Sequence, residues 1–149
     1  MMSGVLTPLW IAVAGAMGTL LRYYAGILTL SWSQRLPWGT ILINITGSFA
    51  IAFFSALTAA HARFPASNEA RLIVMAGLCG GYTTFSSFSL QTIDLARDGA
   101  LVRALLNVTL SVVLCLGATA LGYVSAEAVN GHSASIHASP MHDSDLPRK

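Results

Sequence analysis

The chain is organised as four long runs of apolar residues joined by short polar connections. The runs cover about residues 5–30, 38–60, 72–96 and 101–129. Each run reaches the ~20 residues that an α-helix needs to cross the ~30 Å hydrocarbon core of a bilayer. No stretch alternates between apolar and polar residues as the strands of a membrane β-barrel do. The pattern therefore predicts an all-α membrane protein with four transmembrane helices.

The connections and the C-terminal end carry signals for where helices begin and end. Pro37 suits the first turn of the second helix, and Gly99 suits the end of the third. Ser67 or Asn68 can cap the start of the third helix. From residue 130 the composition changes to Ser, His, Asp and Pro, which is typical of disorder. We therefore predict a four-helix transmembrane domain at residues 1–129 and a disordered tail at 130–149.

Composition agrees with a membrane location. The chain is 54% hydrophobic and only 9% charged, with a net charge of +2, whereas an ordinary soluble domain is roughly 25% charged. We expect membrane lipid around the chain and no nucleic-acid partner. The sequence contains no visible nucleophile–base pair or set of metal ligands, so we do not expect an enzyme.

The arginines give little information about orientation in the membrane. Four helices place Arg63 and Arg71 on one side, and Arg35, Arg97 and Arg103 on the other. This split provides only a weak bias for the positive-inside rule. Either the chain inserts in one orientation, or both orientations insert and two inverted copies form an antiparallel homodimer. Four helices are few to enclose a polar pathway, which favours an oligomer.

The second and fourth runs each have one face of small and polar residues. These faces can serve close helix packing, or they can line a polar pathway. Asn44 favours the second interpretation because a primary amide in mid-membrane has two donors and an acceptor to satisfy. The residues are Thr40, Asn44, Gly47, Ser48 and Ser55 in the second run, and Asn107, Ser111, Cys115, Ala118 and Gly122 in the fourth.

No Asp, Glu, Lys or His lies deep in any run. Asp94 and Glu127 lie near the ends, whereas a proton-coupled or cation-exporting transporter would need a carboxylate within the membrane. Neutral donors suit a small anion or a neutral solute instead. Arg22 lies inside the first run, where it either extends to the interface or supplies positive potential near a vestibule.

The stretch GLCGGYTTFSSFS, residues 77–89, interrupts the third run with glycines and hydroxyls. Gly80 and Gly81 weaken a helix, and threonines can hydrogen-bond the freed backbone groups. We therefore predict a break whose carbonyls are buried in protein or turned to an ion, with two chains supplying four oxygens. Phe85 and Phe88 share a face beyond the break and offer electropositive ring edges to an anion. The alternative is two core rings beside a glycine kink.

Three motifs resemble one family. GGYTTFSSF (80–88) resembles the GGxTTFSTF signature of the CrcB/Fluc fluoride channels. GAMGTLLRYY (15–24) resembles the family's first-helix arginine motif, and WGTILINITGSF (38–49) resembles its second-helix GTxxxNxxG motif. The resemblance covers roughly residues 8–127 and leaves out the tail.

The resemblance implies a passive, fluoride-selective channel that relieves fluoride toxicity in the plasma membrane, here a bacterial inner membrane. Members of the family form antiparallel dual-topology homodimers with two pores. It also implies a structural Na⁺ at the break, held by the backbone carbonyls of Gly80 and Thr83 of each subunit.

The resemblance also implies which side chains line the pore. Phe85, Phe88 and Asn44 match family pore residues, and Asn107 and Ser111 map less directly onto the fourth-helix polar track. Thr40 and Arg22 belong to the other two matching motifs. Many members carry Glu where this chain has Gln91, which can hydrogen-bond an ion but carries no charge.

Two other functions remain as alternatives. A small multidrug-type dual-topology transporter would need a mid-membrane Glu in the first helix, and this chain has none there. A scaffold subunit without transport would explain the small-residue faces but not the hydroxyl-rich break.

Overall fold

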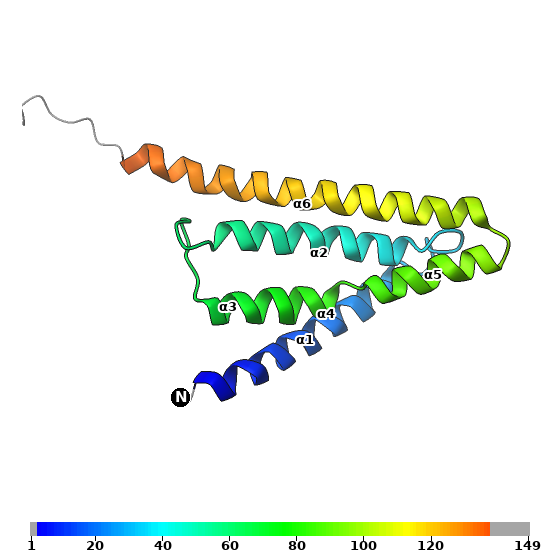
Figure 1. Ribbon diagram of the computed structural model, residues 1–149, viewed down its shortest axis with the longest axis horizontal. Coiled ribbons are helices and arrows are strands. Elements are labelled where there is room, and N and C mark those ends of the chain that lie inside the picture. The colour runs from blue at the N-terminus through cyan, green and yellow to red at the C-terminus, as the bar shows by residue number, and fades with distance from the viewer. Residues whose placement is uncertain (1–2, 138–149) are drawn as a thin grey trace, which may run out of the picture.

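Four long helical segments form residues 3–137, the part of the chain that the computed structural model describes; side chains are described within residues 6–131 (Figure 1). All four segments are long and apolar enough to cross a membrane. The prediction of an all-α, multi-pass membrane protein is therefore confirmed. The three unbroken helices are α1 (Ser3–Leu28), α2 (Trp38–Leu57) and α6 (Leu101–His137).

The third segment is a broken helix. Between its two halves, Thr83 and Thr84 have extended backbone, with ψ angles of 161° and 111°. The predicted break is confirmed, and it lies just beyond the glycine pair. The helical pieces are α3 (Asn68–Leu72), the π-helix η1 (Ile73–Cys79), α4 (Gly80–Tyr82) and α5 (Phe85–Arg97).

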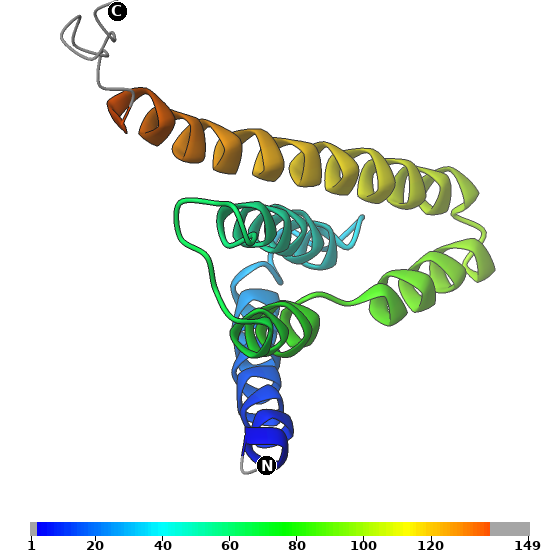
Figure 2. The ribbon, with the colours of Figure 1, turned by 60° about the vertical axis from the view of Figure 1, so that its left-hand side comes forward.

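Gly80 and Gly81, which we expected to weaken the helix, are themselves helical, so the break does not lie at the glycines. Gly81 instead allows a close approach between helices. A Cβ atom at Gly81 would overlap the carbonyl oxygen of Gly15, and one at Gly18 would overlap the carbonyl of Leu78. Helix α1 therefore lies obliquely against η1 and α4 in backbone contact (Figures 1 and 2).

Helix α2 packs along α6, and this is the main helix–helix contact of the chain (Figure 1). Small residues fill it: Ala52 is 3% exposed, Ala118 7% and Ala126 0%. Gly122 is buried in the same contact. This end of the small-residue face on α6 therefore serves close packing.

The C-terminal end of α2 is held by side chains from two other helices. Arg71 donates hydrogen bonds to the Ser55 carbonyl (2.8 Å) and to Thr58 Oγ1 (2.8 Å). Asn130 Nδ2 donates to the Ala56 carbonyl at 3.2 Å, and Asn130 Oδ1 accepts from the Arg63 N–H at 3.1 Å. These bonds satisfy carbonyls that a helix end leaves free.

The fourth helix was expected to end at about residue 129, but in the structure α6 continues to His137. Asn130, taken as the first residue of the tail, is engaged with α2 and the following loop. Residues 138–149 of the predicted tail lie outside the described residues.

Two predicted helix boundaries are confirmed. Ser67 caps the third segment, accepting a hydrogen bond from the Ala70 N–H at 3.2 Å. Gly99 follows the end of α5 with a φ of 76°. The Ala100 N–H then reaches back to the Leu95 carbonyl at 2.9 Å, which completes a glycine-terminated helix end.

Candidate ion pathway at the broken helix

The side chain of Asn44 closes the break in the third segment. Its Nδ2 donates to the Thr84 carbonyl at 3.0 Å, and its Oδ1 accepts from the Thr84 N–H at 2.8 Å. One amide from α2 thus satisfies both backbone polar groups of a residue with extended backbone. At membrane depth such groups need a hydrogen-bond partner from the protein, because the hydrocarbon core contains no water to bond them. We call this pair of hydrogen bonds the Asn44–Thr84 clamp.

Threonine hydroxyls stabilise the helix ends on both sides of the break. Thr83 Oγ1 donates to the Cys79 carbonyl at 2.9 Å. Thr84 Oγ1 caps α5 by accepting from the Ser87 N–H at 3.1 Å. The helix therefore breaks here because two consecutive threonines end one helical piece and begin the next.

Two backbone carbonyls at the break lose their usual hydrogen-bond donors. In an unbroken helix the Thr84 N–H would bond the Gly80 carbonyl, and the Ser87 N–H would bond the Thr83 carbonyl. Here those two N–H groups bond Asn44 Oδ1 and Thr84 Oγ1 instead. Free carbonyl oxygens are the ligands that hard cations prefer, so Gly80 and Thr83 fit the cation that the resemblance implies.

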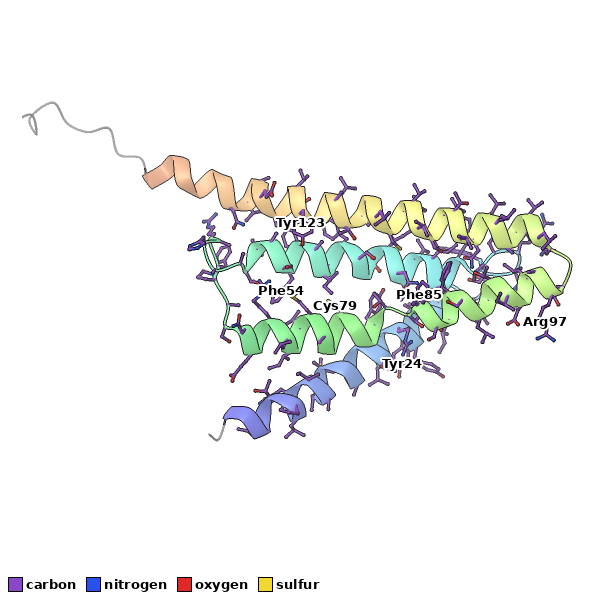
Figure 3. The ribbon with its side chains drawn as sticks, viewed as in Figure 1. Tyr24, Phe54, Cys79, Phe85, Arg97 and Tyr123 are labelled. Atoms are coloured by element: carbon purple, nitrogen blue, oxygen red, sulfur yellow. The ribbon has the colours of Figure 1, made fainter. Side chains whose placement is uncertain are left out.

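A central cavity of ≈ 400 Å³ lies against the break. Phe85 and Phe88 are neighbours in its wall, with ring centroids 5.4 Å apart. Phe85 is 79% exposed in the single chain and stands at the start of α5, just beyond the break (Figure 3). Of the site residues predicted from sequence, the cavity brings together Asn44, Gly80, Thr83, Phe85, Phe88 and Ser111.

A second cavity of ≈ 640 Å³ opens between α1, α2 and α5. We call it the outer cavity. Thr84 lines both cavities, so the Asn44–Thr84 clamp lies between them. The outer cavity contains three of the four remaining candidates in its wall: Arg22, Thr40 and Gln91. Four further charged residues line it that were not predicted as site residues from sequence: Arg35, Asp94, Asp98 and Arg103.

Asn107 is placed differently from the other candidates. Its side chain is 0% exposed and lies against α5, where Nδ2 donates to Thr92 Oγ1 at 2.8 Å. Thr92 was not predicted from sequence, although a hydroxyl on the α5 face opposite Asn107 is a ready acceptor. The neighbouring Ser111 is 6% exposed and lines the central cavity.

Comparison with known proteins identifies the family of the chain. The sequence model of the family described as "CrcB-like protein, Camphor Resistance (CrcB)" matches residues 9–123. The chain belongs to the CrcB family. The match includes all four membrane segments and both halves of the broken helix.

CrcB-family relatives are similar over nearly their whole length. The chain is 59% identical over 130 residues to the "Fluoride-specific ion channel FluC" of Methylobacterium radiotolerans, covering 87% of this chain and 91% of the relative. It is 56% identical over 125 residues to the same-named protein of Gluconobacter oxydans, covering 83% and 87%. That of Methylocella silvestris is 52% identical over 123 residues, covering 82% and 94%. These relatives are ion channels, so the expectation that the chain is not an enzyme is confirmed.

Proposed function

We propose that the chain is a passive fluoride channel of a bacterial inner membrane, which exports fluoride and so relieves its toxicity. The names of its relatives support this proposal. The observation that carries it is the central cavity, where the Asn44–Thr84 clamp and two aromatic rings meet at the broken helix.

Fluoride chemistry explains why such a cavity would suit this ion. Fluoride is small and strongly hydrated, so removing its water is costly unless protein donors replace that water. Ser111 Oγ is buried in the wall without a partner among the described residues, so its hydroxyl can donate to fluoride or to a water held beside it. Asn44 retains one Nδ2 hydrogen beyond its bond to Thr84.

The aromatic rings would let the ion leave again. Phe85 and Phe88 offer electropositive ring edges, which attract an anion more weakly than a fixed cation does. Conduction needs binding that is favourable enough for entry and weak enough for exit. The N-terminus of α5, which begins at Phe85, adds a positive helix end beside the same cavity.

The proposal includes an antiparallel homodimer. Phe85 is 79% exposed in the single chain although it lines the candidate pathway, and a second copy would cover it. The arginines give only a weak bias between the two orientations, which permits dual topology. In this assembly each subunit would provide one wall of the pathway.

A structural Na⁺ would complete the dimer. The carbonyls of Gly80 and Thr83, freed by the break, would hold it. When bound, the ion would supply positive charge near the pathway and satisfy carbonyl oxygens whose usual helical donors bond elsewhere. Backbone carbonyls do not titrate, so protonation of these ligands would not compete with the cation.

A growth assay tests the function. Expression of the chain in a fluoride-sensitive bacterium that lacks its own fluoride exporter should restore growth in fluoride. Failure of rescue by a protein that reaches the membrane would contradict the proposal. Resistance to cationic drugs without fluoride rescue would favour the multidrug-type alternative, although α1 contains no carboxylate to bind such drugs.

A further inference from the structure

The orientation of the Asn107 amide is fixed by a chain of hydrogen bonds between α5 and α6. Thr92 Oγ1 donates its single proton to the Phe88 carbonyl at 2.8 Å. It can therefore only accept from Asn107, whose Nδ2 lies 2.8 Å away. Asn107 Oδ1 must then face the opposite direction.

In that direction the amide oxygen meets no donor. Asn107 is 0% exposed, and no described residue hydrogen-bonds its Oδ1. Most buried polar atoms in native proteins have a partner, so an orphan of this kind calls for an explanation. If the amide turned, Asn107 Oδ1 would lie against Thr92 Oγ1, whose only proton already goes to the Phe88 carbonyl.

A second orphan lies one helical turn away on the same face. Ser111 is 6% exposed, and its Oγ has no partner among the described residues. Other hydroxyls in the same helices donate to the carbonyl four residues earlier, as Thr119 does to Cys115 at 2.9 Å. Ser111 does not, so its proton is available at the wall of the central cavity.

Asn107 Oδ1 and Ser111 Oγ need a partner that donates one hydrogen bond and accepts another. Fluoride has no proton and cannot bond an amide oxygen, whose lone pairs would repel it. Water donates two protons and accepts others. Residues i and i+4 lie on the same face of a helix with Cβ atoms ~5–6 Å apart, so their side chains are close enough for one water to bond a polar atom of each.

We propose that Asn107 Oδ1 and Ser111 Oγ bind a structural water at the edge of the central cavity. One water proton goes to Asn107 Oδ1, and Ser111 donates to the water oxygen. The second water proton then points toward the cavity, where it offers an anion a fixed donor beside Phe88. Asn107 is thus a positioning residue that acts through water: the water, and not the Asn107 amide, contacts the anion in the cavity.

An experimental structure tests the water directly. A structure of the full chain in lipid, at a resolution that shows ordered waters, should contain a water within hydrogen-bond distance of Asn107 Oδ1 and Ser111 Oγ. A protein donor from a second copy at Asn107 Oδ1, or a space without water, overturns the proposal. This test does not depend on the proposed function.

Fluoride flux provides a second test, which rests on the proposed function. Asn107→Leu and Ser111→Ala should each lower fluoride efflux from proteoliposomes about fivefold to tenfold. The double variant should be no slower than either single variant, because each change removes the same water. Losses that multiply would show two independent contacts and overturn the proposal.

Variants of Thr92 separate positioning from packing. Thr92→Ser keeps the hydroxyl that orients the amide and should retain wild-type efflux, whereas Thr92→Val should lower it with an unchanged dimer on size exclusion. Equal efflux by the two variants contradicts the positioning role. Thr119→Val, which removes a hydroxyl bonded only within α6, is the matched control. If wild type itself carries no fluoride, the proposed function fails while the structural test of the water still stands.

Discussion

Replacing Asn44 with alanine should destabilise the extended backbone at the break in the third segment. The side chain supplies both hydrogen-bond partners of the Thr84 backbone, at 2.8 and 3.0 Å. Thr84 is only 7% exposed, so water cannot take over either bond without a rearrangement. The extended geometry at Thr83 and Thr84 would then lose the contact that satisfies it.

The size of the effect follows from two lost hydrogen bonds. Each contributes about 1 kcal/mol net, and a buried group left unpaired costs about 1–3 kcal/mol. Some relaxation will recover part of this, so we expect Asn44→Ala to destabilise the local structure by about 2–4 kcal/mol. A change of this size corresponds to amide exchange at Thr84 that is ~30-fold or more faster.

Hydrogen exchange at the Thr84 amide is the assay, together with fluoride efflux. Efflux should fall about tenfold, because the clamp also positions Phe85 and Phe88 at the cavity. Asn130→Ala is a control, since the Asn130 amide also bonds one backbone carbonyl and one backbone N–H, at the far end of α2 and in the loop after it. It should lower stability but leave both Thr84 exchange and efflux unchanged.

Thr84 exchange that stays slow in Asn44→Ala would refute this reasoning. It would mean that another group satisfies the backbone and that the clamp does not hold the break. Loss of efflux in Asn130→Ala to the same extent would show that general destabilisation, and not the clamp, explains the loss.

Three further predictions test separate parts of the structure. Gly81→Val should disrupt the backbone contact with Gly15 and lower the melting temperature, whereas Gly117→Val, with nothing within 4 Å, should not; equal melting temperatures would refute the contact. Arg71→Met should lose its bonds to the end of α2 and increase protease cleavage of the loop after α2; unchanged cleavage would show that Arg71 does not hold this end. Replacing Na⁺ by a large organic cation on both sides of the membrane should abolish fluoride efflux, and indifference would contradict the structural ion.

The sequence predicted where the third helix is interrupted, but not which residues interrupt it. Composition predicted an interruption near residues 80–84 because glycines and threonines gather there. It misjudged which residues break the helix, because glycine also permits close packing, and only the approach of α1 shows that Gly81 serves this purpose. The threonines break the helix because Asn44, far away in sequence, replaces the lost backbone partners.

The candidate site divides in the same way. Motif resemblance identified Asn44, Phe85, Phe88 and Ser111, which the central cavity brings together. Thr92 and Asn130 gave no signal in the sequence, because the importance of a single hydroxyl or amide depends on which helix faces it. The extension of α6 to His137 was missed for the same reason: the polar residue Asn130 reads as a tail until its contacts with α2 are known.

Fluoride efflux from proteoliposomes of wild type and Phe88→Ile, read with a fluoride electrode, tests the central claim most directly. We expect rapid fluoride release with chloride retained for wild type, and release near that of protein-free vesicles for Phe88→Ile with the assembly intact. Wild-type vesicles that release fluoride no faster than protein-free vesicles, or a Phe88→Ile variant as fast as wild type, would show that the ring-lined cavity is not a fluoride pathway.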